Sequence, residues 1–206
     1  IPNCVIVSIT TPQGHPITRM RRIAGHGTDI ELLERCNEFC RRLCTQHPPV
    51  EEAWSQLSQL SEHTLQYAPH KVLMGYGIAP AFFSPLFGGG AADALCAMTS
   101  GLAIGLCLLY GRRLIGSNSF FRTAICSAVA SLLSLLLVRL GIGQSVDTVT
   151  ISALMVLVPG VALTNAMREI MAGDIISGLI RAAESILTAA AIAIGTAMGL
   201  ALGWMF

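Results

Sequence analysis

The stretch Val149–Asp174, VTISALMVLVPGVALTNAMREIMAGD, constrains the fold of this chain more than any other. Its apolar core, Ile151–Leu163, is 13 residues long, whereas a helix needs about 20 residues to span a bilayer. A span must therefore include the flanking polar residues, which places Pro159-Gly160 near the middle of the membrane. Proline removes a backbone donor and glycine lets the chain turn, and polar groups freed at that depth need protein or water as partners. The stretch predicts an interrupted transmembrane helix, a feature that forms transporter binding sites.

The composition also indicates an integral membrane protein. Of 206 residues, 53% are hydrophobic and 12% are charged, whereas soluble domains usually carry about 25% charged residues. Residues 1–71 hold seven Lys/Arg and seven Asp/Glu, which leaves six Arg and five acids for the rest. No basic patch is interleaved with aromatics, so a nucleic-acid partner is not expected. Because the chain begins at Ile1 in a strand-like run, we interpret it as lacking its true N-terminus.

The polar front, residues 1–70, predicts a small α+β cytoplasmic domain. Cys4–Thr11 is rich in β-branched residues, His15–Arg22 alternates apolar with polar residues, and a Pro-Gln-Gly turn separates them. This pattern is typical of a hairpin. An amphipathic helix should follow from Thr28 or Asp29 to about Thr45, and a second should cover Val50–Gln66.

The remainder, residues 71–206, predicts an all-α transmembrane bundle of five helices, interrupted at Pro159-Gly160. Small residues four apart, Gly101 with Gly105 and Gly195 with Gly199, predict faces where helices approach closely. The expected membrane segments are Val72–Gly88, Ala92–Tyr110, Phe120–Leu140, Thr148–Glu169 and Ile175–Met205.

The basic loops set the expected topology. The Arg112-Arg113 loop and the loop containing Arg168 fall on the same side as the polar front. Under the positive-inside rule this side is the cytoplasm, so the N-terminus is cytoplasmic and Phe206 lies outside. The expected location is the plasma membrane, here a bacterial inner membrane, with lipid around several spans.

Thr164 and Asn165 follow the Pro-Gly interruption by about one turn. Their neutral side chains can hydrogen-bond a carboxylate, an amino group or a hydroxyl of a small solute. Alternatively, they join neighbouring helices or satisfy the carbonyls that Pro159 frees. The sequence leaves both interpretations open.

Arg181 and Glu184 are three residues apart and can interact on one helical face. One interpretation is a partly exposed ion pair at the membrane edge. The other places Arg181 against a substrate carboxylate and Glu184 against an amino group or a coupled proton, because intramembrane ionisable groups are functional candidates. Asp174 and Asp93 each precede or begin an apolar segment, and capping explains both.

Enzyme chemistry is not predicted. The histidines form no HExxH motif, and neither a GxSxG motif nor a P-loop is present. Cys36, Cys40 and Cys44 recur on one helical face, but this spacing matches no standard zinc pattern, so packing is the favoured interpretation. We expect no metal, cofactor or catalytic residue.

Two blocks of sequence carry a family resemblance. LVPGVALTNAMREIMAGD, Leu157–Asp174, continues into IISGLIRAAESILTAAAIAIG and resembles the signature of the threonine/serine exporter family. VSITTPQGHPITRMRR, followed by GHGTDIELLERCNEFCRRL, is similar to the domain that precedes the membrane helices in that family. The positions that match the signature are Pro159, Gly160, Asn165, Gly173, Gly178, Arg181 and Glu184.

The resemblance implies a secondary active transporter that exports small amino acids, threonine and serine, from the cytoplasm. Full-length members have two five-span halves, and this chain resembles the N-terminal half. The resemblance therefore implies a second five-span subunit as partner, arranged as an inverted repeat, and the pair could form a higher oligomer. A split pair of this kind is linked to succinate export, so a dicarboxylate is the alternative substrate. A third alternative is a membrane-anchored scaffold or regulatory subunit. Arg181 with Glu184 suits a zwitterion and favours amino acids.

Overall fold

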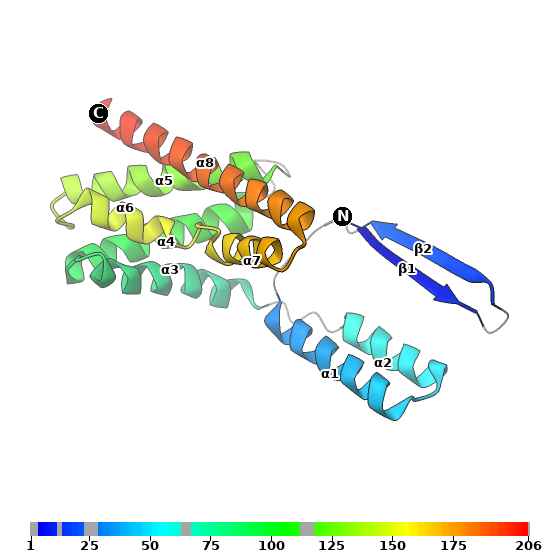
Figure 1. The fold of residues 1–206 in the computed structure, drawn as a ribbon. Helices are drawn as coiled ribbons and strands as arrows, with labels where there is room; N and C mark the ends of the chain where they lie inside the picture. The colour runs from blue at the N-terminus through cyan, green and yellow to red at the C-terminus, as the bar shows by residue number, and fades with distance from the viewer. Residues whose placement is uncertain (1–3, 12–13, 23–28, 63–66, 112–117, 206) are drawn as a thin grey trace. The chain divides into compact units, whose positions relative to one another are not determined.

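The computed structural model describes residues 4–11, 14–22, 29–62, 67–111 and 118–205. It is mainly helical with one small sheet, and it divides into two units, Ile1–Tyr67 and Ala68–Phe206. The elements are labelled in Figure 1.

The first unit begins with the predicted hairpin. Strands β1 (Cys4–Thr10) and β2 (Pro16–Arg22) pair in antiparallel register. The hydroxyls of Ser8 and Thr18, which face each other in this register, lie 2.9 Å apart. Gly14 supplies the left-handed backbone of the turn with a φ of 81°, a conformation that glycine adopts without steric penalty.

Two helices complete the first unit. In α1 (Ile30–Gln46), the Asp29 side chain caps the N-terminus by accepting a hydrogen bond from the Leu32 amide. His47 ends the helix in the left-handed region. Helix α2 (Val50–Glu62) begins where predicted, whereas the predicted extension over 63–66 and the alternative cap Thr28 lie outside the described residues.

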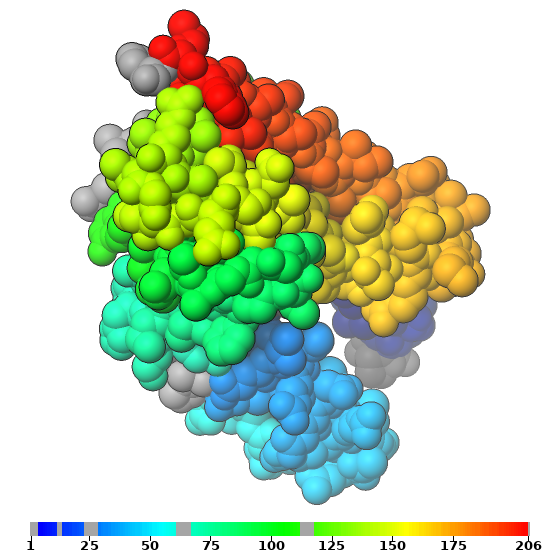
Figure 2. All heavy atoms as spheres, turned by 90° about the vertical axis from the view of Figure 1, so that its left-hand side faces the viewer, coloured from blue at the N-terminus to red at the C-terminus, as the bar shows by residue number. Residues whose placement is uncertain are grey.

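The second unit is a helical bundle in which the chain runs back and forth. Helices α3, α5 and α8 run in one direction, and α4 and the α6–α7 pair run in the other (Figure 1). Figure 2 shows α6 and α7 (yellow) as a band between α4 (green) and α8 (orange to red). The bounds are α3 (Pro69–Leu86), α4 (Ala91–Tyr110), α5 (Ser119–Arg139), α6 (Val146–Leu154), α7 (Gly160–Met171) and α8 (Ile175–Met205).

Three helices of the described chain, α4, α5 and α8, are long and apolar enough to cross a membrane. Helix α3 contains His70 and Lys71 in its first turn and two internal prolines. Helices α6 and α7 are 9 and 12 residues long. Length and composition therefore support a membrane protein with three candidate spans among the described residues, and the count of five stays a prediction.

The predicted glycine faces are places where helices approach each other closely. A side chain at Gly101 would meet the carbonyl of Tyr76 and the ring of Pro80, so α3 packs directly on α4. A side chain at Gly195 would meet the carbonyl of Ala124, so α8 packs directly on α5. In an apolar medium, van der Waals packing is a main attraction between helices. Glycine at these positions allows the close contact that this packing needs.

Candidate functional site

The interruption predicted at Pro159-Gly160 separates α6 from α7. Helix α6 ends at Leu154 and α7 begins at Gly160, with Pro159 at its N-cap position. Within the break, the Leu157 amide donates to the Leu154 carbonyl at 2.8 Å, and the Gly160 amide donates to the Val158 carbonyl at 2.9 Å. These short turns satisfy part of the backbone that the missing helical bonds leave open.

The break packs against the interior of the bundle. Val156 and Leu157 contact a buried apolar group, here called the break cluster, as do Tyr76, Cys107 and Leu108. Helices α4, α5, α6 and α8 all contribute to this cluster, so the irregular backbone is in contact with protein rather than only with lipid. The break cluster consists of Ile104, Cys126, Ala130, Ala153, Leu154 and Ile192.

The two polar residues just after the break differ in whether their side chains are free to hydrogen-bond a solute. The Thr164 hydroxyl donates to the Gly160 carbonyl at 2.9 Å, so it satisfies a backbone group of its own helix. Asn165 is half-buried, and its side chain has no hydrogen-bond partner in the described part of the chain. A side chain at Gly160 would meet no atom within 4 Å. Asn165 is therefore the more available of the two polar groups.

Arg181 pairs with Glu169, not with Glu184. The Arg181 guanidinium on α8 lies 3.1 Å from Glu169 Oε1 on α7. Arg181 is 43% exposed and Glu169 is 25% exposed, while Glu184 is exposed. The expectation of an Arg181–Glu184 interaction is replaced by a bridge between helices, because the turn after α7 folds the two helices back on each other.

Close packing makes this bridge possible. A side chain at Gly178 would meet the Ala166 carbonyl and the Ile170 side chain, so α7 and α8 lie against each other. Glu169 Oε2 is buried without a hydrogen-bond partner among the described residues. Sequence reasoning missed Glu169 because its spacing from Arg181 fits no single helix; an acid and a base on either side of the Gly173-Asp174 turn were the available signal.

Asp93 does more than cap α4. The side chain is 2% exposed, and its Oδ1 accepts hydrogen bonds from the amides of Gln144 at 2.6 Å and Ser145 at 3.2 Å. Its Oδ2 accepts from the Gly90 amide at 3.4 Å. Asp93 thus fastens the turn before α6 to the start of α4. Asp174 lies directly before α8, and its carbonyl accepts from the Gly178 amide.

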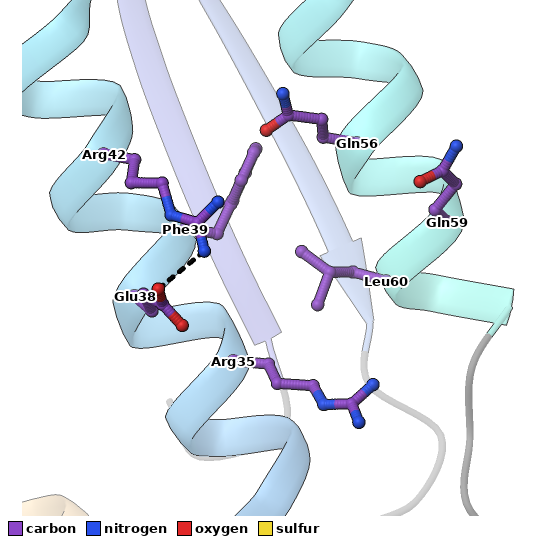
Figure 3. Close-up of a pocket in the computed structure, with 7 residues that line it drawn as sticks. All are labelled: Arg35, Glu38, Phe39, Arg42, Gln56, Gln59 and Leu60. Atoms are coloured by element: carbon purple, nitrogen blue, oxygen red, sulfur yellow. Dashed lines mark hydrogen bonds and ion pairs between the residues drawn. The ribbon is translucent and has the colours of Figure 1, made fainter.

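The helices of the first unit form a groove of about 300 Å³. Figure 3 shows Phe39 and Leu60 reaching into the space between α1 and α2, with Glu38 paired to Arg42 at 2.6 Å. Both partners of that pair are more than half exposed, so the pair is a surface contact. No group of three potential metal ligands gathers within the described residues.

Apolar helices packed side by side, one of them interrupted against the interior of the bundle, define a multi-span membrane protein. A family model described as "Putative threonine/serine exporter" matches residues 1–203. The chain belongs to the threonine/serine exporter family, which is a family of transporters.

Two relatives agree with this membership at low identity. The chain is 23% identical over 201 residues to a "Probable threonine/serine exporter" of Mycobacterium tuberculosis, covering 97% of this chain and 37% of the relative. It is 24% identical over 217 residues to "Pheromone-regulated membrane protein 10" of Debaryomyces hansenii, covering 99% of this chain and 21% of the relative. The chain thus spans little more than a third of the first relative. No solved structure matches this chain.

Proposed function

We propose that this chain is a subunit of a secondary active transporter that exports small amino acids, threonine and serine, from the cytoplasm. Family membership supports transport, and the name of the mycobacterial relative supports the substrate class. The N-terminus is cytoplasmic and Phe206 lies outside, with five spans in a bacterial inner membrane. A second five-span subunit, related as an inverted repeat, completes the transporter.

The observation that carries this proposal is the helix interruption within the bundle. Helix α7 begins at Gly160, inside the break, so the positive end of its backbone dipole is directed there. Interrupted helices bind substrate carboxylates in this way in several transporter folds. Pro159 and Gly160 maintain the interruption between α6 and α7. Asn165 offers an unpaired amide to the solute, and Thr164 stabilises the first turn of α7.

Arg181 and its neighbours form the second part of the proposed site. Glu169 holds Arg181 in the absence of solute, and a substrate carboxylate would compete with Glu169 for the guanidinium. The exposed Glu184 carboxylate receives the substrate amino group or the coupled proton. A cation and an acid on one stretch of helix suit a zwitterion better than a dicarboxylate, which favours threonine and serine over succinate.

Two other functions make different predictions. An exporter of dicarboxylates such as succinate would use Arg181 and have no need of Glu184. A membrane-anchored scaffold or regulatory subunit would tolerate a change in the break. Of the three functions, export of amino acids accounts best for the break, the unpaired Asn165 amide and the Arg181–Glu169 ion pair together.

Reconstitution tests the proposal. The chain and its five-span partner, purified together and placed in proteoliposomes, should transport labelled threonine and serine when an imposed proton gradient drives them, with succinate moved slowly or not at all. Transport should require both subunits and fall when a protonophore removes the gradient. Movement of succinate alone would favour the dicarboxylate exporter, and no movement of any of the three solutes would contradict a transport role.

A further inference from the structure

We propose that Arg122, at the end of the first turn of α5, is an anion-binding residue that receives the carboxylate of the transported solute beside the helix interruption, at a position separate from Arg181 that the solute occupies at another stage of export. The proposal rests on the proposed function for the identity of the solute, and it rests on the structure for the site. It assigns a role to a cation that lies at the edge of an apolar segment and has no recognisable sequence motif around it.

Arg122 carries a buried donor without a partner. Its Nε is inaccessible to solvent and makes no hydrogen bond within the part of the chain that the structure describes. None of the ion pairs seen there includes Arg122. A buried donor on a charged group is strongly destabilising when it stays unsatisfied. A ligand that accepts a hydrogen bond from this guanidinium would remove that penalty.

The described acids of the membrane unit do not neutralise Arg122. Asp93 accepts from three backbone amides at the opposite ends of the helices. Glu169 is paired with Arg181. The acids that remain, Asp147, Asp174 and Glu184, are exposed. The charge of Arg122 is therefore available to a ligand.

Arg122 and the break share their neighbours. Arg122 lies near the Tyr76 phenol of α3 and the Cys126 thiol of α5. Cys126 lies one helical turn after Arg122 and belongs to the break cluster, and Tyr76 packs on that cluster. Val156 and Leu157, in the break itself, pack on the same cluster. The unpaired cation thus lies one helical turn from the group of side chains on which the irregular backbone packs.

These surroundings select a carboxylate. A guanidinium presents parallel N–H donors that match the two oxygens of a carboxylate, and the hydroxyl of Tyr76 can donate a further hydrogen bond. The neighbouring groups named above, a phenol and a thiol, are uncharged in their protonated forms and offer no counter-ion for an ammonium group. The site therefore takes the carboxylate of an amino acid or of a dicarboxylate, and the amino group must bind elsewhere.

Ligand-induced stabilisation tests the site separately from transport. The purified chain with its partner is heated in detergent with and without millimolar threonine, succinate or threonine amide, which lacks the carboxylate. Any solute that binds the folded state raises the midpoint of unfolding. We expect threonine or succinate, but not the amide, to raise the midpoint of the wild type. Arg122→Gln should reduce the rise clearly, because only the separate position at Arg181 remains, and Arg122→Lys should reduce it less.

Arg139→Gln is the matched control, because Arg139 lies on the same helix with its guanidinium 5.2 Å from the centre of the Trp204 ring. This variant should respond to solutes like the wild type. If Arg122→Gln does not fold, Arg122→Lys and Tyr76→Phe take its place, and both should weaken the response. In proteoliposomes, Arg122→Gln should raise the KM for export by roughly tenfold or more, as expected for the loss of a charge-assisted hydrogen bond.

Each outcome decides the proposal. A wild type that carboxylates do not stabilise, or an Arg122→Gln variant that they stabilise equally, overturns the assignment even if export is normal. A response that depends on Arg122 supports the assignment even if the reconstituted pair moves no solute, in which case the proposed function fails alone. Threonine and succinate in parallel distinguish the amino acid from the dicarboxylate as the source of the carboxylate.

Discussion

Arg181 of α8 and Glu169 of α7 form an ion pair at 3.1 Å that ties the helix following the break to the long final helix. Between the two residues the chain turns at Gly173, whose φ is 98°. The pair therefore joins the C-terminal end of α7 to α8. On the proposed function, Glu169, which family resemblance did not point to, would compete with substrate for Arg181.

Replacing Glu169 by Gln should lower the stability of the complex by up to about 1 kcal/mol, the upper end of the range for partly exposed ion pairs. The measurement is the midpoint of thermal unfolding of the purified pair in detergent. Arg181→Gln should lower the midpoint by a similar amount, and the double variant should lose less than the sum, because both changes remove one interaction. Additive losses would contradict a direct pair.

Glu184→Gln is the companion variant and should act on transport alone. The Glu184 side chain is exposed and makes no ion pair within the described residues, so unfolding and assembly should be unchanged. If this carboxylate receives the amino group or the coupled proton, threonine export or its dependence on pH should change. Export kinetics that match the wild type across pH would remove Glu184 from the site.

Asp93→Ala should destabilise the membrane unit by about 2 kcal/mol, because it removes a buried carboxylate that accepts several backbone hydrogen bonds. Three amides, those of Gly90, Gln144 and Ser145, lose the carboxylate. Asp147→Ala, in the same region but exposed, is the control and should change the unfolding midpoint little. Equal effects of the two variants would show that Asp93 does not hold the turn.

Gly199→Leu should separate α8 from α5 and lower stability by about 2 kcal/mol, as overpacking does in other cores. A side chain there would meet the Ala128 carbonyl and the Ser131 hydroxyl. Unfolding in detergent measures the loss. Gly75→Leu, on α3 with open space around it, is the control. A Gly199→Leu protein as stable as that control would refute close packing at this face.

The sequence predicts much of the local structure because the signals are local. The hairpin, the Asp29 cap and the break at Pro159 each follow from residues close together in the chain. The helix faces at Gly101 and Gly195 follow from spacing on one helix.

The charged contacts were not predictable in this way. Arg181 meets Glu169 because two helices fold together, and Asp93 meets the 144–145 amides across about 50 residues of chain. Arg122 is notable only because its buried Nε lacks a partner among the described residues, a property of the packed bundle. Spacing within one helix carries no information on such contacts.

The central claim is that the break between α6 and α7 is part of the transport site. The double variant Pro159→Ala with Gly160→Ala should favour a continuous helix, since alanine restores a donor and has a higher helix propensity. A side chain at Gly160 meets nothing within 4 Å, so folding should be preserved. Gly75→Ala, equally open and far from the break in sequence, is the control.

The direct measurement is the initial rate of threonine export by the reconstituted pair carrying this double variant, at matched protein content. We predict that the rate falls at least about tenfold, a change of roughly 1.4 kcal/mol or more in the barrier, while Gly75→Ala exports at the wild-type rate. An intact rate in a folded double variant would contradict the account and would favour the scaffold function.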